Sequence, residues 1–187
     1  MATATQSSQV LLSAEEFGRR PDPGFPEELF RGHIVIMPPP GARHGQVCAE
    51  ICYILKRYAK ESDLGHVLSN DAGVITERGP DSVRGPDVAY YSYARLPKGP
   101  LPTGYPSVPP DMVFEVFSPF DRWPKVLAKV AEYLEAGVVA VAVADPERSM
   151  VYLYDGERPV TVLGEADILS VPKILGDFQV IVGRFFE

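Results

Sequence analysis

The chain has 187 residues, 45% of them hydrophobic, and its 18 Lys and Arg against 25 Asp and Glu give a formal net charge of −7. This hydrophobic content excludes intrinsic disorder for most of the chain, and the acidic balance excludes a protein that coats nucleic acid by bulk positive charge. The longest apolar run falls far short of the ~20 residues that span a bilayer, and residues 1–20 lack the pattern of a secretory signal. We therefore expect a soluble cytoplasmic protein without membrane contact, folded as a single domain over residues 1–187.

Residues 10–40 are expected to form a short helix and a hairpin. Ser13 followed by Glu16 is the capping-box pattern of a helix start. Strands over residues 27–30 and 34–37 flank a turn that contains a glycine, which is typical of a β-hairpin.

The core is expected over residues 41–146. It begins with a helix over residues 43–61, in which apolar residues recur at helical spacing. Strands are expected over residues 66–69, 73–77, 87–92 and 111–118. The last of these is apolar at both parities, as in a central strand that is covered on both faces.

A second helix over residues 122–136 leads into a strand over residues 138–144. Such a crossover favours parallel pairing of this strand with residues 111–118. In the C-terminal part, residues 147–187, further strands are expected over residues 150–154, 159–163 and 178–186. The fold class is therefore α/β, a mixed β-sheet flanked by helices, with additional hairpin strands at the N- and C-terminal ends.

The two cysteines, Cys48 and Cys52, lie four residues apart on one face of the first long helix. We interpret them as small buried apolar residues. A structural zinc site would need further soft ligands, and the histidines at 33, 44 and 66 form no Cys/His cluster with them in the sequence.

Glu115 is the only charge inside the apolar run of residues 112–117. Burying a lone carboxylate costs several kcal/mol unless it is paired, protonated or bound to a metal. Glu115 is therefore either a site carboxylate or half of a buried ion pair. Asp87, alone, is a common turn residue after Pro86. Beside Glu115 on a neighbouring strand, it would complete a pair of hard oxygen ligands that suit Mg²⁺ or Mn²⁺.

Lys129 lies at the edge of the apolar face of the second long helix. From there its side chain can extend toward the strand of Glu115, where an amine can orient an attacking water or stabilise charge in the transition state. The alternative is an ordinary solvated helix edge. Arg122 and Lys125 lie on the same side and complete a basic strip.

Several further segments complete a pattern of motifs. They are Glu28–Gly32, His44 at a helix start, Pro86–Val88, Glu115–Pro119, Lys129 with Tyr133, Gly137-Val138, Asp145-Pro146 and Gly176–Phe178. In this order and spacing they resemble the bacterial family of putative restriction endonucleases, built on the PD-(D/E)XK nuclease fold. The resemblance covers residue 27 to the end.

The resemblance implies a restriction-endonuclease-like core and a metal ion held by Asp87 and Glu115. In the parent signature a lysine follows the second acidic residue by two positions, where this chain has Phe117. In this family a lysine from the next helix stands in, and the matching position is Lys129.

Two accessory positions also match the family. Glu28 is either a further carboxylate at the metal or a hairpin charge, and His44 is either a contact at the helix N-terminus or a ligand. Aromatic residues near the site are either core residues or platforms for base stacking. These are Tyr90, Tyr91, Tyr93 and Trp123.

The leading hypothesis is a divalent-metal-dependent endonuclease that hydrolyses phosphodiester bonds in DNA, with Asp87, Glu115 and Lys129 as catalytic residues. A homodimer or larger homo-oligomer is expected, because cutting a palindromic duplex needs two active sites. The alternative is an inactive nuclease-fold protein that binds nucleic acid or serves in assembly, which Phe117 and the acidic charge favour. A third hypothesis treats Glu115 as half of a salt bridge in a purely structural oligomeric module.

Overall fold

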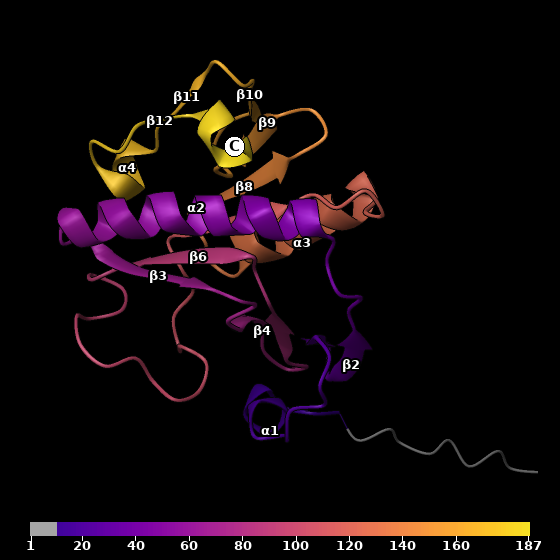
Figure 1. Ribbon diagram of the computed structural model, residues 1–187. Coiled ribbons are helices and arrows are strands. Elements are labelled where there is room, and N and C mark those ends of the chain that lie inside the picture. Colours follow the sequence, from indigo (N-terminus) through magenta and orange to yellow (C-terminus); the bar gives the residue numbers. More distant parts are fainter. Residues whose placement is uncertain (1–10) are drawn as a thin grey trace, which may run out of the picture.

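The computed structural model describes residues 11–187. Residues 1–10, which belong to the expected domain and to the segment searched for a secretory signal, lie outside the described residues. A six-stranded mixed sheet lies between two long helices, α2 (Ala42–Glu61) and α3 (Trp123–Glu135), and a smaller four-stranded sheet adjoins it (Figure 1). The predicted α/β class is confirmed. Among the described helices, none combines the length and the apolar character needed to cross a bilayer.

The strands of the large sheet follow one another in space as β10 (Thr161–Leu163), β9 (Met150–Tyr154), β8 (Ala140–Asp145), β7 (Met112–Val116), β6 (Val88–Ser92) and β3 (Gly65–Ser69). The small sheet has the order β2 (His33–Ile36), β1 (Glu27–Phe30), β5 (Ser82–Arg84) and β4 (Val74–Glu77). Shorter elements are α1 (Ala14–Gly18), β11 (Ile168–Leu169), α4 (Pro172–Leu175), β12 (Val180–Ile181) and the 3₁₀ helix η1 (Val182–Phe186).

β7 is the centre of the large sheet and positions the site. It pairs in parallel with β8 through the crossover helix α3, as predicted, and antiparallel with β6. Val88 is paired with Phe114. Continuing this antiparallel register by one residue puts Asp87 opposite Glu115.

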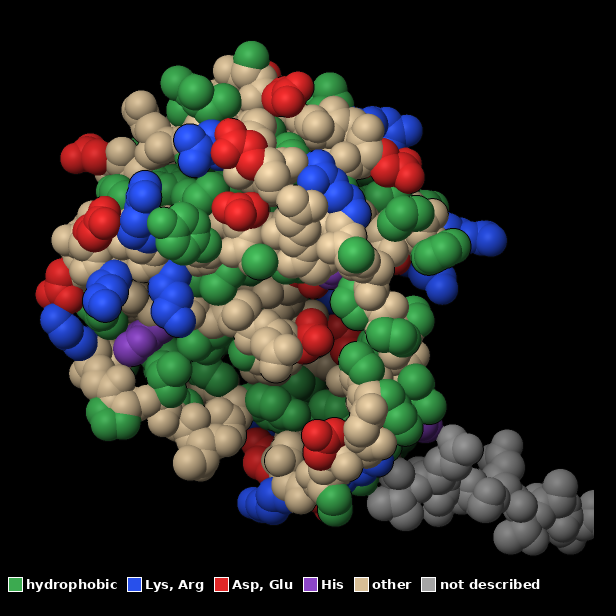
Figure 2. Space-filling view, in the orientation of Figure 1, with side chains coloured by type: hydrophobic (Ala, Val, Ile, Leu, Met, Phe, Trp, Pro, Cys, Tyr) green, Lys and Arg blue, Asp and Glu red, His purple; other side chains and the backbone are tan. Residues whose placement is uncertain are grey.

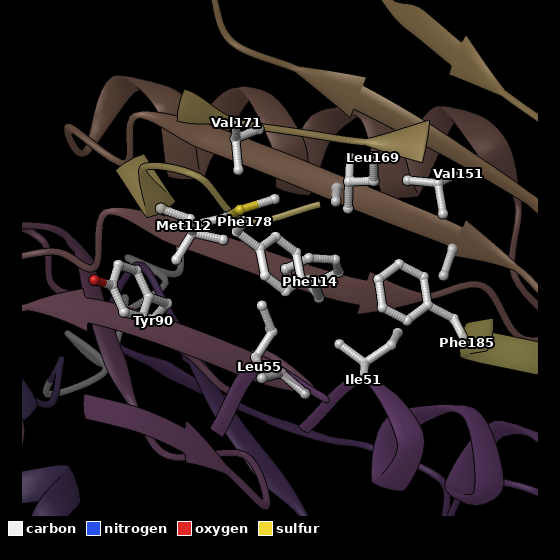
Figure 3. Packing of buried hydrophobic residues seen from close by; sticks show 14 of the residues in the cluster. Ile51, Leu55, Tyr90, Met112, Phe114, Val151, Leu169, Val171, Phe178 and Phe185 are labelled. Carbon is white, nitrogen blue, oxygen red and sulfur yellow. The ribbon is translucent and has the colours of Figure 1, made fainter. Parts of the chain in front are cut away.

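The two faces of the large sheet pack against different helices. On one face, Ile51 and Leu55 of α2 and Phe185 of η1 surround Phe114 of β7 (Figure 3). On the other face, valines of β7 and β8 pack on Val130 and Tyr133 of α3. Each large side chain buried in this way contributes about 1.5–3 kcal/mol, so both faces of β7 are fixed by burial.

The N-terminal elements agree with the sequence. Ser13 and Glu16 form the predicted capping box of α1, and β1 and β2 form the predicted hairpin, with Gly32 of its turn at φ 78°. The short strand β5 was not predicted, because its three residues lie between glycine and proline residues that favour a loop.

The predicted strand over residues 178–186 is wrong. Only Val180–Ile181 form a strand, and the chain then turns into η1. Val182 and Phe185, three residues apart, are both fully buried, and Phe186 is buried beside Phe185. Burial at a spacing of three, with two adjacent buried aromatics, fits a 3₁₀ helix and not a strand that alternates between two faces.

Candidate active site

The candidate site lies where β6 begins beside the end of β7. Asp87 immediately precedes β6, and its Oδ2 accepts a hydrogen bond of 2.6 Å from the backbone N–H of Val116 in β7. This contact and the register bring together Asp87 and Glu115, the two carboxylates singled out in the sequence. Burial raises the pKa of the Glu115 carboxyl group, and the charge of Asp87 raises it further.

Glu115 points from β7 toward α3, and its side chain is only 13% exposed. Its Oε1 accepts a hydrogen bond of 2.8 Å from the Tyr133 hydroxyl and lies 3.0 Å from Lys129 Nζ. Burial raises the pKa of Glu115 to about 7, and Lys129 and Tyr133 oppose that rise. The carboxyl group therefore gains or loses its proton close to neutral pH.

Lys129 reaches from α3 between two carboxylates. Its Nζ lies 3.0 Å from Glu115 Oε1 and 3.1 Å from Glu28 Oε1. Burial disfavours the ammonium group, but Glu115 and Glu28 outweigh it and raise the pKa of Lys129 above its ordinary value. Lys129 is thus a charged residue fixed between Glu115 and Glu28, and it does not lie on an ordinary solvated helix edge.

Glu28 is buried, at 5% exposure, so it is not a free hairpin charge. It pairs with Arg84 at 2.9 Å as well as with Lys129, and it accepts a hydrogen bond from the Gly85 backbone. Burial would raise the pKa of Glu28, but these two cations hold it below its usual range. Glu28 is therefore an ionised residue fixed at the back of the site.

Arg84 and Glu132 complete a charged network that the sequence analysis missed. Arg84 Nη2 lies 2.6 Å from Glu132 Oε2, and Arg84 Nε also donates to the Glu132 carboxylate. Glu132 follows Lys129 by three residues on α3, so helical spacing was a signal that both residues share a face. Nothing in the sequence marked Arg84, because its strand looked like a loop.

His44 lies in the first turn of α2, and it contacts Asp87 with one ring nitrogen and Cys48 with the other. Nε2 is 3.4 Å from Asp87 Oδ1, and Nδ1 is 3.4 Å from Cys48 Sγ. Burial opposes protonation of His44, but Asp87 raises the pKa of the ring. Burial and the charge of Asp87 also raise the pKa of the Cys48 thiol.

The prediction that the histidines form no cluster with a cysteine is wrong. One donor atom each of His44, Cys48 and Asp87 lie within 4.8 Å of one another. The sequence separation of four puts His44 and Cys48 on one helix face, and the fold then brings Asp87 to them from β6. Cys48 and Cys52 are partly buried and pack against the core, so the interpretation as small buried apolar residues is confirmed only in part.

A cavity of about 450 Å³ opens over this cluster, and Asp71 of the β3–β4 loop is also part of its lining. Figure 2 shows a hollow with acidic side chains beside the start of α2. Burial and Asp87 raise the pKa of Asp71, a residue the sequence analysis missed. Asp71 has φ 55°, and a Cβ on Gly85 would lie 2.8 Å from its Cβ, so glycine is needed for this close approach.

Two of the aromatic residues near the site, Tyr90 and Tyr91, are buried, whereas Tyr93, Phe117 and Trp123 are partly buried. Tyr90 and Tyr91 are each 1% exposed, on opposite faces of β6, so base stacking is excluded for both as folded. Phe117, at the position of the parent lysine, stacks on Trp123 with ring centroids 4.7 Å apart. Trp123 also packs edge-on against Tyr152.

The arrangement concentrates negative charge around two cations. Three carboxylates, Glu28, Glu115 and Glu132, surround Arg84 and Lys129. Asp87 is a fourth carboxylate beside these three, and within residues 11–187 its only ion-pair partner is His44. Such a surplus of carboxylates favours binding of a cation, and oxygen donors suit a hard divalent one.

Two comparisons with known proteins agree with this architecture. The model of the Uma2 family, described as "putative restriction endonuclease", matches residues 14–183. A solved structure of a "putative nuclease belonging to DUF820" from Anabaena variabilis superposes with a TM-score of 0.77 at 19% identity, over 94% of this chain and 97% of that one. A comparison with curated proteins gave no match. The chain thus belongs to the Uma2 family of putative restriction endonucleases and has the restriction-endonuclease-like fold of the PD-(D/E)XK superfamily.

Proposed function

We propose that this protein is a divalent-metal-dependent endonuclease that hydrolyses phosphodiester bonds in DNA, with Mg²⁺ or Mn²⁺ bound by Asp87 and Glu115. The observation that carries the proposal is the meeting of these two carboxylates, from β6 and β7, beside the buried ammonium group of Lys129. Hard oxygen donors from one or two carboxylates are the usual protein ligands of Mg²⁺, which keeps several of its waters.

The donor set fits such an ion. Asp87 Oδ1 contacts His44 at a long distance of 3.4 Å, and Asp87 and Glu115 repel each other electrostatically. A divalent cation between them would relieve that repulsion. When bound, it would lower the pKa of a coordinated water and neutralise charge on the phosphoryl group.

The remaining residues hold the catalytic groups in place. Lys129 would orient the attacking water or stabilise the charge that develops in the transition state. Glu28 Oε1 also lies 3.1 Å from Lys129 Nζ, so the amine would have a second partner if Glu115 bound a metal ion. Glu28, Arg84 and Tyr133 are positioning residues in this proposal.

A homodimer or larger homo-oligomer would supply two active sites for the two strands of a duplex. The edge strand β2 supports this part of the proposal. Its apolar residues Ile34, Val35 and Ile36 are all exposed, and within residues 11–187 no strand pairs with its outer edge. An exposed apolar edge is a template for pairing with a second copy. Molar mass measured by light scattering should fall in a Val35→Lys variant; an unchanged mass would remove β2 from the interface.

Plasmid cleavage with purified protein tests the activity. Wild-type protein should cleave DNA with Mg²⁺ or Mn²⁺ and stop when the ion is chelated, whereas Asp87→Asn and Glu115→Gln should each abolish cleavage and retain the circular dichroism spectrum. Glu135→Gln, an exposed carboxylate on α3, is the matched control. If the double variant cleaved DNA as fast as the wild type, the cleavage would come from a contaminating nuclease, and the proposal would be overturned.

The second candidate is a nuclease-fold protein without catalytic activity that binds nucleic acid or serves in assembly. Phe117, which fills the parent lysine position and stacks on Trp123, favours it. The two candidates differ in metal binding. Calorimetric titration with Mn²⁺ should show saturable binding that is lost in Glu115→Gln; absence of binding to the wild type would favour the inactive form.

A further inference from the structure

The α2 side of the site offers a second kind of metal-binding chemistry. His44 and Cys48 lie one helical turn apart on α2, and Asp87 reaches the same point from the start of β6. A nitrogen, a sulfur and an oxygen from these residues lie within 4.8 Å of one another. Three donors of different type thus converge from two separate elements.

The three donor atoms are spaced so that a small contraction would bring them to the geometry of a zinc site. His44 Nδ1 lies 3.4 Å from Cys48 Sγ, and His44 Nε2 lies 3.4 Å from Asp87 Oδ1, so the two contacts use different nitrogens of one ring. A single ion binds only one of these nitrogens, and with one donor atom taken from each residue the three atoms lie within 4.8 Å of one another. With Zn–S near 2.3 Å and Zn–N or Zn–O near 2.1 Å, neighbouring ligand atoms of a tetrahedral site lie about 3.3–3.6 Å apart. A turn of the imidazole and a shift of roughly 1 Å in the most distant donor would close the set around one ion.

The donor types select the ion. Mg²⁺ binds through oxygen, whereas thiolate and imidazole ligands favour Zn²⁺ and its neighbours in the transition series. Three protein ligands leave a fourth position open for water. The cavity of about 450 Å³, which His44, Cys48 and Asp87 help to line, gives access to that position.

We propose that His44, Cys48 and Asp87 form a binding site for a borderline-soft divalent ion such as Zn²⁺. The site shares Asp87 with the proposed Mg²⁺ site. Asp87 Oδ2 already accepts the Val116 N–H, so Oδ1 is the oxygen that faces His44. Zn²⁺ bound there withdraws a ligand from Mg²⁺ and repels it, and therefore inhibits cleavage. This inhibition, unlike the binding itself, rests on the proposed nuclease function.

The same three residues also stand in the order Cys–His–Asp, with His44 in contact with Cys48 through Nδ1 and paired with Asp87 through Nε2. Such an order of residues activates some cysteine nucleophiles. The surroundings favour metal binding over that chemistry. The helix dipole favours a thiolate only in the first turn of α2, and Cys48 lies beyond that turn. Three carboxylates, Asp87, Glu115 and Asp71, also act on Cys48 and disfavour a free thiolate. A reactive thiol is therefore an alternative outcome of the test.

Co²⁺ is the probe, because a cobalt–thiolate bond gives a charge-transfer absorption band that oxygen ligands alone do not give. The reduced full-length protein should develop this band to saturation near one equivalent of CoCl₂, and ZnCl₂ should then displace it. Cys48→Ser and Cys48→Ala should lose the band. His44→Asn removes a ligand, so it should weaken cobalt binding by more than the roughly 10–100-fold that loss of a hydrogen-bond partner of a ligand costs. Cys52→Ser is the matched control that keeps the band, since Cys52 lines the same cavity outside the cluster.

Failure of this site and failure of the nuclease proposal are distinguishable. Glu115→Gln should lose cleavage and keep the cobalt band, because Glu115 is outside the three-residue cluster. A wild-type protein without the band, or a folded Cys48→Ser variant that keeps it, overturns the zinc site whatever the cleavage assays give. Rapid alkylation of Cys48 by iodoacetamide that Zn²⁺ does not slow would assign the cluster to a reactive thiol instead. A cobalt band without any cleavage leaves the zinc site standing and removes the nuclease function.

Discussion

The two sides of the Asp87–Glu115 pair are built in opposite ways. On the α3 side, Arg84 and Lys129 are surrounded by carboxylates at 2.6–3.1 Å, so each charge there has a close partner. On the α2 side, His44 contacts Asp87 at 3.4 Å and borders an open cavity. We call the ion pairs of Arg84 and Lys129 with their carboxylates the closed network. The α2 side, where His44 and Asp87 line the cavity, is the open side.

The α3 side fixes the positions of catalytic groups, whereas the α2 side is able to bind a ligand. A buried ion-pair network contributes little net stability, but removing one partner leaves an uncompensated buried charge, which is costly. The closed network therefore fixes Lys129 and Glu115 in one geometry. Polar groups with long contacts beside a cavity have coordination capacity left for a ligand, which is what the α2 side provides.

The largest effect should come from opening the closed network. Arg84→Met removes the cation that pairs with Glu132 and one of the two cations that pair with Glu28, while it keeps the volume of the side-chain stem. It should lower the free energy of unfolding by about 3–5 kcal/mol. Urea denaturation measures this. Arg158→Met, at the exposed pair with Asp155, is the control and should cost below about 1 kcal/mol. Equal losses in the two variants would show that the network is not a closed unit.

The second-largest effect should be on the rate of cleavage, after substitution of Lys129 in the closed network. Lys129→Met should reduce the rate of cleavage at saturating metal by about 10²–10³-fold, because it removes charge stabilisation in the transition state. The Kd for Mn²⁺ should change far less. Lys125→Met, one turn earlier on the exposed side of α3, should leave the rate unchanged. If Lys129→Met keeps the wild-type rate, or if Glu115→Gln unfolds the protein, the pair is structural.

Much of the fold follows from the sequence, because its strongest signals are local or periodic. The apolar run 112–117, the crossover through α3 and the capping box at Ser13 were all recognisable and are confirmed. The C-terminal segment was misread, because the burial of Phe185 and Phe186 depends on contacts with α2 and β7, which lie far away in the sequence. Short segments take their structure from such contacts more than from their own pattern.

The site was predictable to the extent that each residue carried a local anomaly. Glu115 was a charge in an apolar strand, and Asp87 gained meaning beside it. Cys48 and Arg84 gave no such signal, because a cysteine on a helix face and an arginine in a glycine–proline segment are both ordinary. Their roles arise only when the fold brings Asp87 to α2 and brings Glu28 of β1 to Arg84 of β5.

The pH dependence of metal binding sharpens the comparison further. With the pKa of Glu115 raised to about 7, the carboxyl must release a proton to bind a metal at lower pH. Affinity for Mn²⁺ should therefore fall up to about tenfold per pH unit below 7 and level off above it, with proton uptake by the buffer in calorimetry at pH 6. The dependence should persist in His44→Asn, which removes the titrating group of the open side. A flat profile between pH 6 and 8 would contradict the raised pKa.

The smallest effect should come from Tyr133→Phe. Tyr133 is fully buried, and its hydroxyl donates a hydrogen bond of 2.8 Å to Glu115 Oε1. This hydrogen bond lowers the pKa of the Glu115 carboxyl group. Without it the pKa of Glu115 rises further, so the midpoint of the Mn²⁺ affinity profile should move to higher pH, while stability falls by about 1 kcal/mol. Cleavage should then be slowed at pH 6.5 and nearly normal at pH 8.5. Tyr152→Phe, whose hydroxyl has only a 3.9 Å contact with Met150 Sδ, is the control and should keep the wild-type profile. A rate reduced equally at both pH values would instead mean that the hydroxyl orients Glu115 without tuning its charge, and the closed network would then act through geometry alone.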